Sequence, residues 1–181
     1  MKRVLIFSLA YAPFIGGAEV ALKEITERLL KFEFELITVN LDGKQPTEEK
    51  IARVLVKRIG RGKISKYLYP WQAAKLAVKQ HQEKPYDLIW AMMANQAGMA
   101  AVMFKKSFPE VPFLLSLQEG DDFASFSYAA RLLGPRLFGV FKKADYCQAI
   151  SRYLAEWGRK MGFRGEPMVV PNGVDLSKFH G

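Results

Sequence analysis

Short apolar runs that alternate with helical patterns are the feature that most limits what this chain can fold into. The runs are rich in Val, Ile, Leu and Phe, and several are apolar on both faces, as expected of strands covered by helices above and below. Strands that alternate with helices pair in parallel through right-handed crossovers. The sequence therefore predicts an α/β fold with a doubly wound parallel sheet of about seven strands. The expected strands are 3–9, 34–40, 53–59, 86–92, 111–117, 145–150 and 167–170.

Amphipathic stretches between these runs predict the helices. In the first, the apolar residues recur at the spacing of one helix face and charged residues occupy the rest. Because no linker interrupts the pattern, residues 1–170 of this 181-residue chain are predicted to form one domain. The expected helices are 18–31, 71–83, 96–106, 128–143 and 151–161.

The amino terminus allows two interpretations. Met1-Lys2-Arg3 followed by an apolar run is similar to a signal peptide, and it is also what a buried first strand would look like. We favour the strand, because Pro13 interrupts the apolar stretch. The single cysteine, Cys147, suits a reducing compartment, and no apolar run approaches the ~20 residues of a membrane span. We therefore expect a cytoplasmic protein, with peripheral attachment at the inner face of a membrane as an option.

The positive charge of the chain is concentrated in one segment. The sequence has 27 Lys and Arg against 18 Asp and Glu, and nine of the basic residues lie between Lys50 and Gln82, where no acidic residue occurs. The net charge of +9 therefore belongs to this segment. It could be a solvated rim, or a surface for an anionic membrane; nucleic acid is less favoured because the aromatic residues are clustered. The candidate patch consists of Lys57, Arg58, Arg61, Lys63, Lys66 and Trp71.

Two adjacent glycines, Gly16 and Gly17, separate the first predicted strand from the first helix. In open parallel sheets, ligands bind at the carboxyl ends of the strands. The free N–H groups of a helix start favour an anion, and glycine lets the backbone approach a ligand closely. A tight turn without a ligand is the alternative. Glu19 in the first helical turn would compete with a phosphate, so a bound phosphate requires its side chain to point away or to bind a hydroxyl.

Polar residues gather at two other predicted strand exits. After the fifth strand they could bind sugar hydroxyls, cap the next helix or, less favourably, hold a metal ion. After the fourth strand, Asn95 could instead cap the helix that follows. The two histidines, His81 and His180, lie at no strand exit, so a histidine-based catalyst is not expected. The candidates for binding an acceptor or a sugar are Asn95, Gln96, Gln118, Glu119, Gly120 and Asp121.

Four motifs in order along the chain give a family resemblance. The segments "PFIGGAE", "SLQEGDD", "AIS" at Ser151 and the closing "VVPNGVDLSKF" together resemble the amino-terminal half of retaining glycosyltransferases of family four. The resemblance spans essentially the whole chain and implies one Rossmann-like half of a GT-B architecture. It further implies that residues 171–181 begin the crossover to a carboxy-terminal donor domain absent from this chain.

The resemblance also implies an activity. A hexosyltransferase of this family moves a sugar from a nucleotide-sugar to an acceptor hydroxyl, with a sugar, a lipid-linked compound or a polysaccharide as acceptor. The backbone at Gly16 and Gly17 would then approach the donor diphosphate, no further cofactor or metal is expected, and the fragment alone would be inactive. Gln118 stands where relatives often carry a histidine, so it is a weak candidate for a catalytic residue. A stand-alone binding module for an anionic partner is the alternative function.

Overall fold

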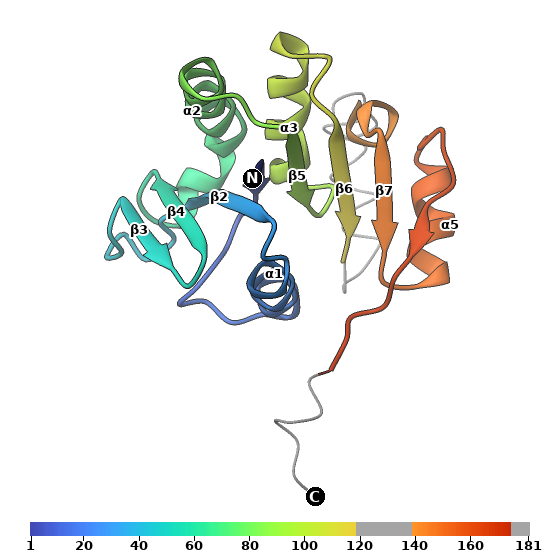
Figure 1. Ribbon diagram of the computed structural model, residues 1–181, viewed down its shortest axis with the longest axis horizontal. Helices are drawn as coiled ribbons and strands as arrows, with labels where there is room; N and C mark the ends of the chain where they lie inside the picture. The colour runs from blue at the N-terminus through green and yellow to red at the C-terminus, as the bar shows by residue number, and fades with distance from the viewer. Residues whose placement is uncertain (119–138, 175–181) are drawn as a thin grey trace, which may run out of the picture.

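The computed structural model describes residues 1–118 and 139–174 of the chain. They form one eight-stranded sheet in the order β3-β4-β2-β1-β5-β6-β7-β8, which Figure 1 shows from β3 across to β7. All strand pairs are parallel except β3 with β4. The strands are β1 (Lys2–Phe7), β2 (Phe32–Val39), β3 (Glu48–Ile51), β4 (Val54–Ile59), β5 (Leu88–Met92), β6 (Phe113–Leu117), β7 (Tyr146–Ala149) and β8 (Met168–Val169).

The doubly wound α/β class and all seven expected strands are confirmed. The eighth strand, β3, was not predicted, because it has only four residues and reads Glu-Glu-Lys-Ile, with no apolar run to mark it. It lies at the edge of the sheet and returns antiparallel to β4 through Ala52, whose φ is 51°. A short, charged edge strand of this kind discourages pairing with other chains.

The helices cover both faces of the sheet. Residues 139–143 are also helical; they are the described part of the expected helix 128–143. In the part of the chain that the structure describes, no helix combines the length and apolar character that a membrane crossing requires. The other helices of the described residues are α1 (Gly17–Arg28), the 3₁₀ helix η1 (Lys63–Tyr67), α2 (Tyr69–Glu83), α3 (Gln96–Ser107) and α5 (Arg152–Lys160).

Successive residues of the central strand β1 supply two separate cores. Val4 and Ile6 pack in a cluster with α1, whereas Leu5 and Phe7 pack in a larger cluster with α2, α3 and α5. Because successive side chains of a strand point to opposite faces, α1 lies on one face and the other three helices on the opposite face. The strand order also reverses at β1, which pairs with β2 on one side and β5 on the other. The first apolar run is therefore the central strand, as we expected.

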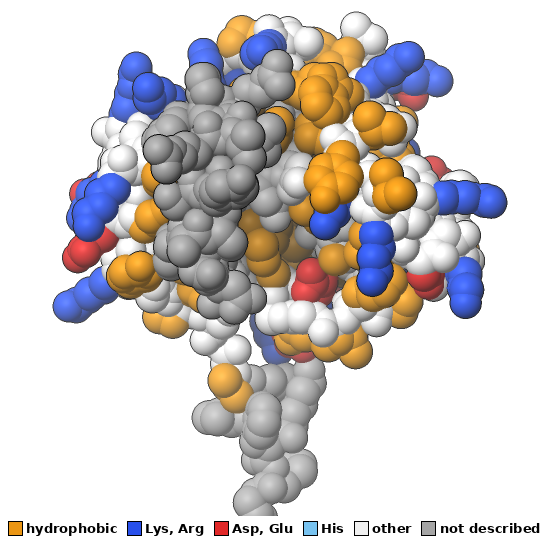
Figure 2. All heavy atoms as spheres, turned by 180° about the vertical axis from the view of Figure 1, so that it is seen from behind, with side chains coloured by type: hydrophobic (Ala, Val, Ile, Leu, Met, Phe, Trp, Pro, Cys, Tyr) orange, Lys and Arg blue, Asp and Glu red, His pale blue; other side chains and the backbone are white. Residues whose placement is uncertain are grey.

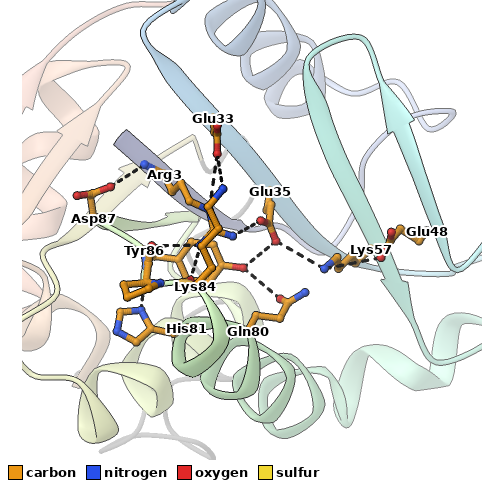
Figure 3. Close-up of polar contacts among 11 residues, drawn as sticks. Arg3, Glu33, Glu35, Glu48, Lys57, Gln80, His81, Lys84, Tyr86 and Asp87 are labelled. Atoms are coloured by element: carbon orange, nitrogen blue, oxygen red, sulfur yellow. Dashed lines mark hydrogen bonds and ion pairs between the residues drawn. The ribbon is translucent and has the colours of Figure 1, made fainter. Parts of the chain in front are cut away.

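A buried polar network ties the strands to the end of α2 (Figure 3). Glu35 of β2 accepts hydrogen bonds from Arg3 of β1 and from the Tyr86 hydroxyl, the latter at 2.8 Å, and its Oε2 lies 3.6 Å from Nζ of Lys57 in β4. Burial raises the pKa of Glu35, but the hydrogen bonds from Tyr86 and Arg3 lower it below its ordinary value. Burial and the hydrogen bond to Glu35 raise the pKa of Tyr86. The network therefore keeps Glu35 ionised and Tyr86 neutral while it joins three strands.

His81 at the end of α2 belongs to the same region. Its Nδ1 accepts a hydrogen bond from the backbone N–H of Tyr86 at 3.0 Å, and its ring lies against Phe104 and Phe108. Burial lowers the pKa of His81 below its ordinary value. The folded protein therefore holds His81 neutral, with Nδ1 as the acceptor that the buried N–H of Tyr86 needs.

We predict that the folded protein loses stability between pH 7.5 and pH 5.5 through His81. Its folded pKa lies below the unfolded value of about 6.5, so the unfolded state binds the proton first as the pH falls. The contribution is fully present above about pH 6.5 and declines below it, by at most about 1.4 kcal/mol per pH unit. Urea unfolding at pH 7.5 and at pH 5.5 measures this change in the free energy of unfolding. The variant His81→Gln keeps a side-chain acceptor without titrating, and an equal pH dependence in this variant would contradict the assignment.

Candidate active site

The carboxyl ends of the strands bring several predicted site segments to one edge of the sheet. Gly16 and Gly17 follow β1, Asn95 follows β5 and Gln118 follows β6. The strand order reverses between β1 and β5, and ligands of open α/β sheets bind in the crevice at such a reversal. This edge is therefore the candidate site.

The helix α1 begins at the glycine pair without a side-chain cap. Gly16 is the N-cap residue, with extended backbone angles of −129° and 174°, and as a glycine it provides no side-chain cap hydrogen bond. A Cβ added to Gly17 would meet no other atom within 4 Å, whereas one added to Gly16 would contact the carboxylate of Glu19. The helix start is thus accessible to an anion, and the Glu19 carboxylate already lies against it.

A buried arginine fixes the loop that leads to the glycines. The Arg58 guanidinium donates to the backbone carbonyl of Ala12 at 2.6 Å and pairs with Glu49 of the edge strand. Its side chain is almost completely buried. Arg58 therefore joins the loop after β1 to the end of β4, and it supplies no exposed charge to the basic patch in which we had placed it.

The residues after β5 are engaged within the protein. The Asn95 side-chain oxygen accepts from the N–H of Ala97 at 2.8 Å, which makes Asn95 the N-cap of α3, and Gln96 is the first residue of that helix. Met93 just before them has a φ of 72°, a strained value for a residue other than glycine. The structure thus supports the capping role for Asn95. Strained backbone conformations such as that of Met93 cluster at functional sites.

Gln118 lies after β6 and pairs with a residue of the last described segment. Its side-chain amide exchanges two hydrogen bonds with the amide of Asn172, at 3.3 and 3.4 Å, and Gln118 is only 7% exposed. Each amide keeps hydrogen-bonding capacity for a hydroxyl group beyond this pair. Sequence reasoning missed Asn172 as a site residue, although its position in "PNG" next to a turn was visible. The other candidates after this strand, Glu119, Gly120 and Asp121, lie outside the described residues.

One cavity connects the start of α1 with the segment that contains Asn172. Its volume is about 580 Å³, and Gly17, Ser116 and Asn172 contribute to its wall. The remaining described wall is mostly apolar and comes from the length of α1, from β1, β2, β5 and β6, from Gln148 of β7 and from residues 170–174. Ser116 accepts a hydrogen bond from the Trp90 indole at 2.9 Å, so the indole N–H has its partner within the fold. The cavity thus lies between Gly17 and Asn172, and Asn172 is hydrogen-bonded to Gln118. Asn95 and Gln96 do not contribute to the cavity wall.

The basic patch divides into two groups. Lys57 pairs with Glu35 and Glu48, and Arg58 is buried, so both lie within ion pairs of the fold. Arg61, Lys63 and Trp71 are exposed and Lys66 is partly exposed. These four residues lie on or beside η1, directly after β4, at the same edge of the sheet as the glycine pair.

Among the residues that the structure describes, no histidine or cysteine lies at this edge. Cys147 is buried in β7, and His81 lies at the far end of α2 within the polar network. Across residues 1–118 and 139–174, no group of three or more His, Cys, Asp and Glu side chains is arranged to hold a metal ion. The described groups at this edge include the backbone N–H groups at the start of α1, the amides of Gln118 and Asn172, and the exposed cations Arg61 and Lys63.

Comparisons with solved structures find proteins that share the fold of this chain. Similar solved structures include sucrose-phosphate synthase from Thermosynechococcus elongatus, with a TM-score of 0.78, 14% identity, and coverage of 99% of this chain and 50% of that one. The trehalose-6-phosphate protein from E. coli bound with UDP-2-fluoro glucose gives a TM-score of 0.67 at 12% identity, covering 98% of this chain and 50% of that one. The apo lipopolysaccharide outer core galactosyltransferase WaaB gives 0.64 at 14% identity, covering 98% and 47%.

At these identities the likeness shows the fold, and this chain spans about half the length of those proteins. The comparison with curated protein sequences finds no match. The profile of Glycosyltransferase Family 4 matches residues 15–178, which is most of the chain and includes both the glycine pair and the "PNGVD" segment. The chain therefore belongs to glycosyltransferase family 4, and its sheet is one Rossmann-like half of a GT-B fold.

Proposed function

We propose that this chain is the acceptor-side half of a hexosyltransferase that moves a sugar from a nucleotide-sugar to an acceptor hydroxyl with retention of configuration. The observation that carries the proposal is the uncapped start of α1 at Gly16 and Gly17, placed where the strand order reverses. Family membership supports glycosyl transfer, and the accessible helix start suits a donor diphosphate.

The donor-binding half, by this proposal, lies in sequence beyond these 181 residues. Residues 171–181 would begin the crossover to it, and the 181-residue fragment alone would be inactive. Similar solved proteins support this arrangement, since they are about twice as long as this chain. The cytoplasm is the proposed location, because one buried cysteine suits a reducing compartment.

The residues of this half would act by position and electrostatics. Backbone N–H groups at the start of α1 would stabilise the negative charge that develops on the departing nucleoside diphosphate. The amides of Gln118 and Asn172 would orient an acceptor hydroxyl on the face of the sugar from which the diphosphate leaves. Glutamine forms hydrogen bonds but does not carry a proton as imidazole does, so Gln118 is assigned a positioning role.

Two related structures support the choice of substrates. One similar protein from E. coli is bound with UDP-2-fluoro glucose, and a trehalose-phosphate synthase from Burkholderia xenovorans is in complex with glucose-6-phosphate. For this chain we propose a nucleotide-sugar as donor and a sugar, lipid-linked or polysaccharide hydroxyl as acceptor. Donor and acceptor meet without a metal ion or further cofactor in this proposal.

The proposal is tested by turnover of the full-length protein. Release of nucleoside diphosphate is measured with UDP-, GDP- and ADP-hexoses in the presence of sugar and glycolipid acceptors. Proton NMR of the product then gives the anomeric configuration, which we expect to match that of the donor. An inverted product would reject retention. Absence of release from every donor, in a protein shown to be folded, would reject the transferase function and favour the binding module.

Gly17→Val is predicted to weaken nucleoside diphosphate binding without harming the fold. The added Cβ meets no protein atom within 4 Å, so we expect the free energy of unfolding to change by less than about 0.5 kcal/mol. A bound diphosphate would clash with the new side chain, and its Kd should rise about tenfold or more. Calorimetric titration of the full-length protein measures the Kd for nucleoside diphosphate in the wild type and in Gly17→Val. The control is Ile15→Ala, in the exposed loop before Gly16. Unchanged affinity would remove the phosphate role from this helix start.

Glu19→Gln is predicted to act in the opposite direction on binding. Its carboxylate lies against Gly16, where it compensates the helix dipole in place of a ligand. Removing the charge should destabilise the fold by about 0.3–1 kcal/mol and tighten nucleoside diphosphate binding about threefold, with a smaller gain at high salt. The control Glu27→Gln neutralises a charge in the last part of α1. Weaker binding by Glu19→Gln would instead indicate that this carboxylate holds a hydroxyl of the ligand.

Gln118→Ala and Asn172→Ala are predicted to raise the KM for the acceptor while the affinity for nucleoside diphosphate stays constant. Each substitution removes one amide of a hydrogen-bonded pair. In a double-mutant cycle on kcat/KM, we expect the two effects to be coupled by about 0.5–1.5 kcal/mol. Gln72→Ala on the exposed side of α2 is the control. Additive effects would mean that the pair does not act as a unit on the acceptor.

A further inference from the structure

The connection between β4 and α2 exposes an unusual set of large apolar side chains. Ile64 is 79% exposed, Tyr67 60%, Leu68 57% and Trp71 48%. Four such residues within eight positions form a continuous stretch of the chain, and clustered apolar exposure of this kind marks a contact surface. We call this set, together with Arg61, Lys63, Lys66 and Lys75, the η1 surface.

The exposure of these side chains is imposed by a rigid anchor. Tyr69, between Leu68 and Trp71, is fully buried, and its hydroxyl donates to the backbone carbonyl of Ile37 in β2 at 2.7 Å. Pro70 beside it is also buried and lies in the first turn of α2. Because this anchor turns inward, the apolar residues on either side of it are held outward. The η1 surface is therefore a fixed feature of the fold.

The basic residues of the η1 surface keep their charge available. Arg61, Lys63, Lys66 and Lys75 form no ion pair with the described residues, and the sequence from 51 to 82 contains no acidic residue. Nζ of Lys66 lies 5.2 Å from the centre of the Tyr67 ring. In Figure 2, Lys and Arg side chains lie next to hydrophobic ones on the right of the molecule, over the half of the sheet that holds β3 and β4. Positive charge thus surrounds apolar side chains that point to solvent.

The η1 surface also lies at the edge of the sheet that holds the candidate active site. The N–H of Gly62 donates to the carbonyl of Asn40, directly after β2, at 2.8 Å. Arg58 at the end of β4 holds the loop before Gly16 through Ala12. Whatever contacts the η1 surface will therefore face the same side of the molecule as the start of α1.

We infer that the η1 surface docks on an anionic phospholipid bilayer, with Ile64, Tyr67, Leu68 and Trp71 entering the interface and Arg61, Lys63, Lys66 and Lys75 contacting the headgroups. Aromatic and aliphatic side chains among basic residues fit the boundary between headgroups and acyl chains. A nucleic acid offers flat bases to aromatic rings, but it offers nothing to Ile64 and Leu68. The inference does not depend on glycosyl transfer, although docking would hold the candidate site close to a lipid-linked acceptor.

Vesicle co-sedimentation of the full-length protein tests the inference. The vesicles contain phosphatidylcholine alone or phosphatidylcholine mixed with the anionic lipid phosphatidylglycerol, whose negative surface potential attracts basic residues. We expect binding to the anionic vesicles only, decreasing as salt is raised. Lys63→Gln/Lys66→Gln should lower the partition coefficient about 25-fold, since each charge near the surface contributes about a factor of five. Ile64→Ser should also reduce binding.

Matched controls separate this surface from general charge and hydrophobicity. Lys143→Gln/Lys160→Gln removes two exposed basic residues elsewhere, and Leu30→Ser removes an exposed apolar side chain near the end of α1. We expect both controls to bind like the wild type, and circular dichroism to show equal folding in all variants. Equal binding by wild type and the η1 variants, or no binding to anionic vesicles, would overturn the inference. Salt-sensitive binding to a DNA duplex without vesicle binding would also overturn it, in favour of a nucleic acid.

Nucleoside diphosphate release is measured without vesicles and vesicle binding without nucleotide-sugar. Loss of one property therefore leaves the other measurable, and the two proposals can fail separately.

Discussion

The central strand β1 sets the arrangement on which the rest of the molecule depends. It is hydrogen-bonded to β2 on one side and β5 on the other, and its alternate side chains enter two different cores. The chain leaves β1 toward one face of the sheet and leaves β4 toward the other. As a result, α1 lies on one face, and α2, α3 and α5 lie on the opposite face. The loop after β1 therefore opens at the reversal of strand order, and the start of α1 is left accessible to a ligand.

The acidic residues near the sheet determine which basic residues remain available. Glu35, Glu48 and Glu49 pair with Lys57 and Arg58, and these pairs join β2, β3 and β4. The pair of Arg3 with Glu35 adds β1. The basic residues of the η1 surface, which follow β4, form no ion pair with the described residues. A segment of uniform charge in the sequence thus becomes two structures, an internal ion-pair network at β4 and an exposed cationic surface at η1.

The sequence predicts the sheet well because the strands supply buried side chains to both cores and therefore contain apolar runs. It misses β3, whose polar edge position leaves no apolar signal, and it shifts strand ends by one to two residues. The candidate site is predicted less completely. The position of Gly16 and Gly17 follows from their place between a strand and a helix, whereas the pairing of Gln118 with Asn172 joins residues 54 apart and depends on tertiary contact. Burial of Arg58 was equally hidden, because a basic residue in a basic segment looks exposed until its partners are known.

Arg58 connects the end of β4 with the loop that leads to the start of α1. A buried guanidinium has to be fully paired, and Arg58 meets this demand with Glu49 of the edge strand and the carbonyl of Ala12. The same residue lies one position before the end of β4, from which the chain continues into η1. Arg58 thus ties the strand that leads into η1 to the loop that leads to Gly16, and both segments keep their positions at the same edge of the sheet.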